Sequence, residues 1–148
     1  MDWSHYRFVS TWELPAPPRA VYAHLERVEH YPRWWPQVRE VTRVDESSGT
    51  ARIRSLLPYD LVVTLRARRH DVPGGVLEVT LTGDLDGWAR WTVVPHGAGS
   101  RATYEQEVVV RRGLMRVLAV PGRPLFRANH ALMMRAGRRG LAARLEAV

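Results

Sequence analysis

The feature that most constrains this chain is a helical pattern of apolar residues at its C-terminal end, over residues 124–148. Residues of one stripe recur at intervals of three or four, which is the period of one face of an α-helix: Phe126, His130, Met133, Gly137, Leu141 and Leu145. Pro124 suits the first turn, where its missing N–H costs nothing. At about 1.5 Å per residue the helix is roughly 36 Å long, which is enough to cross a small domain.

Two positions of this stripe are unusual for a helix that only seals a core. His130 is polar and Gly137 has no side chain, whereas leucine at both places would fill a core more simply. We therefore expect the helix to cover a sheet, with unfilled space between the two layers.

Strand and turn signals dominate the rest of the chain. Residues 5–14 alternate between two faces, as in a half-buried strand, and a proline-rich stretch ends it. A short helix is expected over 17–26, followed by at most one helical turn and a bend over 28–38, where two prolines flank two tryptophans. Turn signals then separate six further strands, expected near residues 38–45, 50–57, 60–70, 75–83, 86–95 and 101–110.

The short turns imply sequential antiparallel hairpins, whose registers can be tested by charge pairing. Centring each turn on its glycine or proline residues aligns four residues of alternating charge on four neighbouring strands: Arg68, Glu78, Arg90 and Glu105. Opposite charges that face each other across strands are favourable, so this ladder is assigned to the water-facing side. The other side then faces the helix. The register of 50–57 stays open, and Arg52 and Arg54 point to either face.

The composition excludes several kinds of chemistry and partner. The chain has 148 residues, 45% of them hydrophobic, which suits one domain over 1–148. Cysteine is absent and the six histidines show no metal-ligand spacing, so no metal or other cofactor is expected. The net charge is +7 and all 22 basic residues are arginine, but without a nucleic-acid motif no nucleic-acid partner is expected. In the absence of a signal-peptide or membrane-spanning pattern, a cytoplasmic monomer or homodimer is expected.

The expected order of elements is one strand, two short helices, six strands and a long C-terminal helix. This order predicts an α+β helix-grip fold, in which a curved antiparallel sheet of six to seven strands wraps around the helix. Four segments carry a family resemblance: WELPAPPRAVY at 12–22, YPRWWP at 31–36, GWARW at 87–91 and SRATY at 100–104. Through them the chain resembles the START-like (SRPBCC) superfamily, in the branch of polyketide cyclases/dehydrases and lipid transport.

This resemblance covers nearly the whole chain and implies a ligand cavity between sheet and helix. Resemblance to the aromatic polyketide cyclases further implies an arginine and a tyrosine that orient a poly-β-ketone inside the cavity. Tyr104 matches the tyrosine. Arg90 is assigned to the outer face, which leaves Arg54 or Arg69 for the arginine.

Ten residues are predicted to line the ligand site: Trp35, Leu77, Ala89, Trp91, Tyr104, Gln106, Asn129, His130, Met133 and Gly137. Small residues on both layers leave a space that large apolar side chains surround, and His130, Tyr104 and Gln106 supply polar groups that orient a guest. The alternative interpretation is a filled core, with a buried neutral His130 and a Trp91–Tyr104 pair packed across a hairpin. We expect a cavity of about 300 Å³ or more, opening near Trp35 and the segment 114–120.

Three functions are compatible with these residues. The first is binding of a small, mainly apolar ligand, such as a lipid, a polyketide or another hydrophobic metabolite. The second is a cofactor-free polyketide cyclase or dehydratase, with His130 and Tyr104 as the catalytic acid and base. The third is a membrane-associated lipid or quinone carrier, in which the apolar segment 114–120 and flanking arginines make transient contact with anionic membrane.

Overall fold

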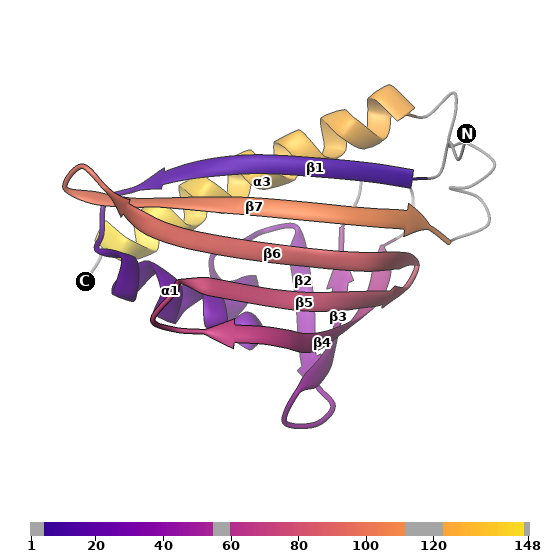
Figure 1. Cartoon of the computed structure of the whole chain (residues 1–148). Helices are drawn as coiled ribbons and strands as arrows, with labels where there is room; N and C mark the ends of the chain where they lie inside the picture. The colour runs from indigo at the N-terminus through magenta and orange to yellow at the C-terminus, as the bar shows by residue number, and fades with distance from the viewer. Residues whose placement is uncertain (1–4, 55–59, 112–122, 147–148) are drawn as a thin grey trace.

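The computed structural model describes residues 5–54, 60–111 and 123–146. One strand, a short α-helix, a 3₁₀ helix, six strands and a long α-helix follow one another along the chain (Figure 1). Their bounds are β1 His5–Leu14, α1 Pro18–Glu26, η1 Val28–Arg33, β2 Val38–Arg43, β3 Ser48–Ile53, β4 Leu61–Asp71, β5 Val76–Gly83, β6 Leu85–His96, β7 Gly99–Val110 and α3 Arg123–Glu146. The α+β helix-grip architecture predicted from the sequence is confirmed.

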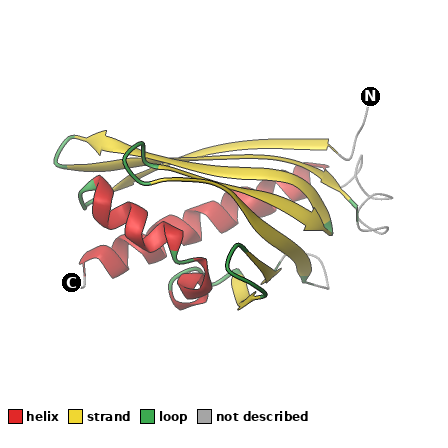
Figure 2. Cartoon of the chain, turned by 60° about the horizontal axis from the view of Figure 1, so that its bottom comes forward, coloured by secondary structure: helices red, strands yellow, loops and turns green. Residues whose placement is uncertain are grey.

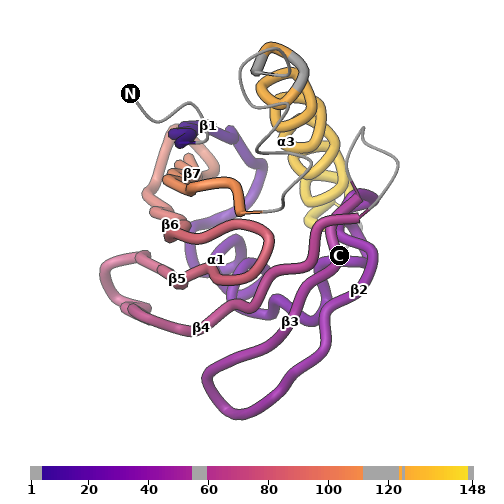
Figure 3. The backbone as a smooth tube through the Cα atoms, turned by 90° about the vertical axis from the view of Figure 1, so that its right-hand side faces the viewer, coloured from indigo at the N-terminus to yellow at the C-terminus, as the bar shows by residue number. Residues whose placement is uncertain are grey.

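The seven strands form one antiparallel sheet in the order β1-β7-β6-β5-β4-β3-β2. Strands β2 to β7 pair with their neighbours in sequence, and β1 pairs with β7. The two helices α1 and α3 lie on the same face of the sheet (Figure 2). In Figure 3 the sheet curves from β1 round to β2, and α3 lies at the opening between these two edge strands. The concave face of the sheet therefore surrounds the space that α3 covers.

The concave face buries two apolar clusters. Toward the C-terminal half of α3, one cluster contains the rings of Trp12, Trp34, Trp35 and Trp91 together with Leu141. Toward the beginning of α3, the other contains Tyr6, Leu61, Leu81, Val108 and Phe126. Tyr104 packs against both clusters, so it lies at the junction between them.

The charged ladder predicted for the convex face is present. Arg68 pairs with Glu78 at 3.0 Å, Arg90 pairs with Glu78 at 3.1 Å, and Arg90 also pairs with Glu105 at 3.2 Å. Arg7 of β1 extends the ladder to a fifth strand through a 3.4 Å contact with Glu105. The prediction is wrong in one detail, because a β-bulge between Ala67 and Arg69 makes Arg69, and not Arg68, the backbone partner of Glu78.

The undecided register of β3 is settled by its pairing with β4. Ala51 pairs with Val63 and Ile53 pairs with Leu61, and all four residues line the concave side. Arg52 and Arg54 are exposed.

The segment 114–120 lies outside the described residues. Of the helices described, none combines the length and apolar character needed to cross a membrane.

Candidate functional site

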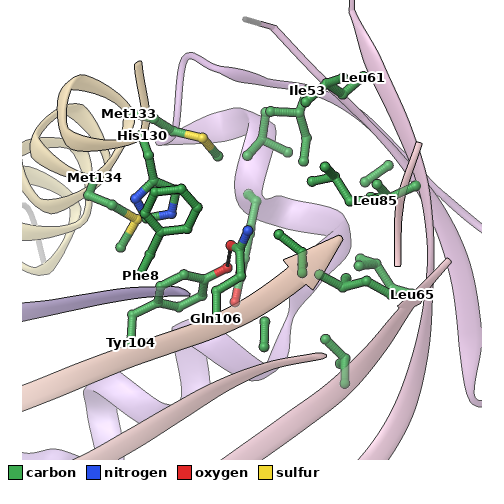
Figure 4. Close-up of a pocket in the computed structure, with 18 of the residues that line it drawn as sticks. Phe8, Ile53, Leu61, Leu65, Leu85, Tyr104, Gln106, His130, Met133 and Met134 are labelled. Carbon is green, nitrogen blue, oxygen red and sulfur yellow. Dashed lines mark hydrogen bonds between the residues drawn. The ribbon is translucent and has the colours of Figure 1, made fainter. Parts of the chain in front are cut away.

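A cavity of about 180 Å³ lies between the sheet and α3. Its described lining comes from all seven strands, from η1 and Trp35 after it, and from the first half of α3. Figure 4 shows part of this lining. The expected volume of 300 Å³ or more is therefore wrong. The space is smaller because Phe8 of β1 enters it and stacks on His130, with 3.9 Å between ring centroids and 10° between ring planes.

Nine of the ten predicted site residues line this cavity: Trp35, Leu77, Ala89, Trp91, Tyr104, Gln106, Asn129, His130 and Met133. The hairpin register explains why they meet. Leu77 pairs with Trp91, and Trp91 pairs with Tyr104, so three strands present these side chains to the same face. His130 and Met133 face them from α3, one helical turn apart.

Gly137 is the exception, because it is not among the cavity-lining residues. A Cβ atom at Gly137 would lie 2.5 Å from Cε2 of Trp35 and 2.8 Å from Cη2 of Trp12, which is too close for any side chain. The missing side chain therefore allows α3 to pack directly on tryptophan rings. It does not leave space for a ligand.

Trp35 forms a wall of the cavity and does not lie at an opening, contrary to the expectation from the sequence. Its side chain is only 3% exposed. The indole Nε1–H donates a hydrogen bond to the carbonyl oxygen of Met133 at 2.9 Å, and the ring packs against Trp12, Tyr31 and Trp34. Packed aromatic rings therefore form this part of the cavity wall.

The polar groups of the cavity gather on one side. Tyr104 and Gln106 are two residues apart on β7 and share a face, and the Tyr104 hydroxyl donates to Oε1 of Gln106 at 2.5 Å. His130 lies next to them, with its ring centroid 6.0 Å from that of Tyr104. Figure 4 shows these three residues on one side, across the space from Ile53, Leu61, Leu65 and Leu85. A guest molecule would thus meet a polar end and an apolar end.

Burial keeps the titratable groups of this cluster uncharged. It lowers the pKa of His130 to about 4, so the imidazole is neutral at pH 7. Burial also raises the pKa of the Tyr104 hydroxyl well above its usual value, so the phenol keeps its proton. Among the described residues that line the cavity, none is an aspartate, a glutamate or an arginine.

The arginine that the family resemblance implied is not found in this lining. Arg54 and Arg69 are exposed. Arg90 lies on the convex face, where its guanidinium contacts Glu78 and Glu105 and lies 4.9 Å from the Trp88 ring centroid. The described lining therefore contains a tyrosine but no arginine.

Further lining residues were not predicted from the sequence. They include Phe8, Tyr31, Met134 and apolar residues from β2, β3 and β4, such as Val41, Ala51 and Val63. The alternation of residues 5–14 puts Phe8 on the same face of β1 as Tyr6 and Trp12, but it does not place Phe8 against His130. Within the described ranges, no group of three or more histidine, aspartate or glutamate side chains is arranged to hold a metal ion.

The fold and the cavity between the sheet and α3 together define a START-like helix-grip protein. Residues 5–147 match the model of the family described as "Polyketide cyclase / dehydrase and lipid transport", and the chain belongs to this family. No curated protein matches the chain significantly.

Solved structures support the same fold assignment. The chain is similar to TTHA0849 from Thermus thermophilus, with 15% identity, a TM-score of 0.74, and coverage of 95% of this chain and 98% of that one. The Zhui aromatase/cyclase from Streptomyces sp. R1128 has 16% identity, a TM-score of 0.76 and coverage of 96% and 93%. A START superfamily protein from Mycobacterium smegmatis has 16% identity, a TM-score of 0.73 and coverage of 96% and 97%. At these identities the likeness establishes the fold alone.

Proposed function

We propose that this chain binds a small, mainly apolar molecule in the cavity between its sheet and α3. The observation that carries the proposal is a cavity of about 180 Å³ whose described lining is apolar apart from one small polar cluster. Pockets of this kind commonly bury a ligand and orient it through a few polar groups. Membership of the polyketide cyclase/dehydrase and lipid transport family is consistent with this function.

The volume limits the size of the guest. An engineered apolar cavity of about 150 Å³ binds benzene, so a cavity of about 180 Å³ suits a molecule built around one aromatic ring or a chain of similar bulk. A longer lipid would need the cavity to expand. We therefore choose a single-ring hydrocarbon, isopropenylbenzene, as the probe.

The test compares wild type with Ala89→Leu, a variant that fills the cavity from β6, where Ala89 is buried on the lining. A probe concentration of ten times Kd should stabilise wild type by about 1.4 kcal/mol and raise its Tm by roughly 3–5 °C. The Tm of Ala89→Leu should not respond. If wild type also fails to respond, or if both proteins respond equally, the cavity is not the binding site.

A separate measurement, native mass spectrometry of protein purified from its own host, would identify any natural ligand that remains bound.

A second candidate, cofactor-free cyclisation or dehydration of a polyketide, is supported by Tyr104 and His130 facing one cavity and by the family to which the chain belongs. A neutral His130 can accept a proton, and a protonated Tyr104 can donate a hydrogen bond to a ketone. We rank it second because the Tyr104 hydroxyl already bonds Gln106, and no arginine lies in the described lining. Turnover of a poly-β-ketone thioester by wild type but not by His130→Ala would support it, and equal turnover would remove His130 from the mechanism.

A further inference from the structure

Gln106 is a buried amide with unused hydrogen-bonding capacity. Its side chain lines the cavity from β7, and the residue is 8% exposed. The bond from the Tyr104 hydroxyl occupies Oε1. The amide nitrogen Nε2 carries two N–H donors, and no described residue accepts a hydrogen bond from it. Nε2 is not among the fully buried polar atoms that lack a partner, so it is reachable from the cavity, where it can meet water or a polar atom of a guest.

Tyr104 determines which end of the amide faces that partner. In the orientation found here the Tyr104 hydroxyl donates to Oε1, which leaves Nε2 presented to the cavity as a donor. Because burial raises the pKa of Tyr104, this donor persists across the ordinary pH range. Without the hydroxyl, the amide could rotate and present its oxygen instead. Tyr104 is thus a positioning residue for Gln106.

We infer that the amide of Gln106 donates a hydrogen bond to a carbonyl oxygen of the bound molecule, and that the cavity selects an uncharged ligand with such a carbonyl over a carboxylate. This inference rests on the proposed function and specifies its ligand. A ketone or ester oxygen matches an N–H donor and leaves the rest of the guest in contact with leucine, isoleucine and valine side chains. The assignment gives the polar cluster a role in ligand choice.

Selection against a carboxylate follows from the absence of a positive charge in the described lining, because Arg127, which lies 6.0 Å from the Phe8 ring, is exposed on the outside. No arginine lies in the described lining, and the chain has no lysine. His130 is the described titratable base in the cavity, and burial holds its pKa at about 4, so it stays neutral above that pH. An ionised group buried without a counter-charge is strongly disfavoured. A fatty acid or an aromatic acid would therefore bind poorly in its ionised form.

Three probes of nearly the same shape separate the effect of the carbonyl hydrogen bond from that of apolar contact and from that of a negative charge. Acetophenone has a carbonyl oxygen, isopropenylbenzene replaces that oxygen by a CH₂ group, and benzoate replaces the methyl group by a charged oxygen. Each is titrated at pH 7 into wild type, Gln106→Leu and Tyr104→Phe. The comparison uses the change in the ratio of ketone to alkene affinity from one protein to another, because the different water solubilities of the probes contribute equally to every ratio and cancel.

Side-chain amide signals give an independent readout by ¹⁵N NMR. The chain has only two glutamines and one asparagine, Gln37, Gln106 and Asn129, so the spectrum contains three side-chain amide pairs. The Gln106 pair is identified by its loss in Gln106→Leu. In wild type, acetophenone should shift this pair downfield, and isopropenylbenzene should not. Because the shift is read in wild type, it does not depend on the ligand affinity of the leucine variant.

The expected result is a ketone-to-alkene affinity ratio that falls about tenfold in Gln106→Leu and by a smaller factor in Tyr104→Phe, because the carbonyl loses its donor. Benzoate should bind wild type at least about 100-fold more weakly than acetophenone. An unchanged ratio in Gln106→Leu, an unshifted Gln106 amide, or benzoate binding as tight as that of acetophenone would overturn the inference but leave the proposed function standing. Failure of all three probes to bind would overturn both.

Discussion

His130 shows how burial sets the chemistry of a single residue. Its ring stacks on Phe8 at 3.9 Å and lies 6.0 Å from the Tyr104 ring, and no described residue makes a hydrogen bond to either ring nitrogen. Neutral imidazole tolerates these neighbours, whereas imidazolium would be desolvated among them. The residue is therefore a polar but uncharged part of the cavity wall at neutral pH.

The lowered pKa of His130 makes stability depend on pH. The folded-state value of about 4 lies below the unfolded value of 6.5, so the unfolded chain binds more protons between these values. Stability from the neutral imidazole is fully present above pH 6.5 and is lost as the pH falls toward 4. The loss should reach about 3 kcal/mol.

Urea unfolding of wild type and His130→Gln at pH 7.5, 6, 5 and 4.5 measures this effect. The variant has no titrating group at position 130, so the difference in unfolding free energy between the two proteins isolates the imidazole from carboxylates that also titrate in acid. Wild type should lose stability relative to His130→Gln over this range. Parallel pH profiles would show that His130 is solvated.

At the scale of the element, α3 is distinguished by two glycines on its inner side. A Cβ at Gly137 would meet the Trp35 and Trp12 rings, and a Cβ at Gly140 would meet the backbone oxygen of Trp34. Glycine inside a helix costs about 1 kcal/mol relative to alanine. That cost is offset by close packing on the tryptophans and by the Trp35 hydrogen bond to the Met133 carbonyl.

Gly137→Ala should therefore destabilise the protein by about 1–2 kcal/mol, because overpacking against rigid rings outweighs the gain in helix propensity. Ala131→Gly is the matched control, since Ala131 is exposed on the same helix and this change should cost about 1 kcal/mol through propensity alone. Both values come from urea unfolding. A stabilised Gly137→Ala variant would mean that α3 is not closely packed on Trp35.

At the scale of the whole molecule, the curved sheet separates two kinds of surface. Its convex face carries ion pairs across five strands, from Arg7 of β1 to Arg68 of β4. Its concave face carries the apolar residues that line the cavity. Alternation along each strand produces both faces at once, because successive side chains point to opposite sides. Because Arg90 and Glu105 of the ladder point outward, their sequence neighbours Trp91 and Tyr104 point inward.

Removing one arginine from the ladder should have a small effect. In Arg90→Gln, Glu78 keeps Arg68 and Glu105 keeps Arg7, so the cost should be about 1 kcal/mol or less. In the double variant Arg68→Gln/Arg90→Gln, Glu78 loses both partners although the residue is only 8% exposed. The double variant should therefore exceed the sum of the two single variants by about 1 kcal/mol. Strict additivity in urea unfolding would show that Glu78 is well solvated.

Much of this arrangement could be predicted from local sequence patterns. The alternation in 5–14 predicted β1 as a half-buried strand, and turn chemistry with charge pairing predicted that Trp91 lies opposite Tyr104. The stripe over 124–148 predicted the long helix and placed His130 and Met133 on its inner side. These features depend on the fixed periods of strands and helices, so they can be counted along the chain.

The distances between layers depended on the tertiary structure. How closely α3 approaches the sheet determines that Gly137 contacts tryptophan rings and not a ligand, and that Phe8 stacks on His130. The cavity volume and the lowered pKa of His130 follow from the same packing. By itself, then, the sequence determined which side chains face inward, because side-chain direction follows from local geometry. Only the tertiary structure decided how much space remains between them. That space depends on how far apart the sheet and α3 lie and on how much of the gap is filled by side chains from distant parts of the chain.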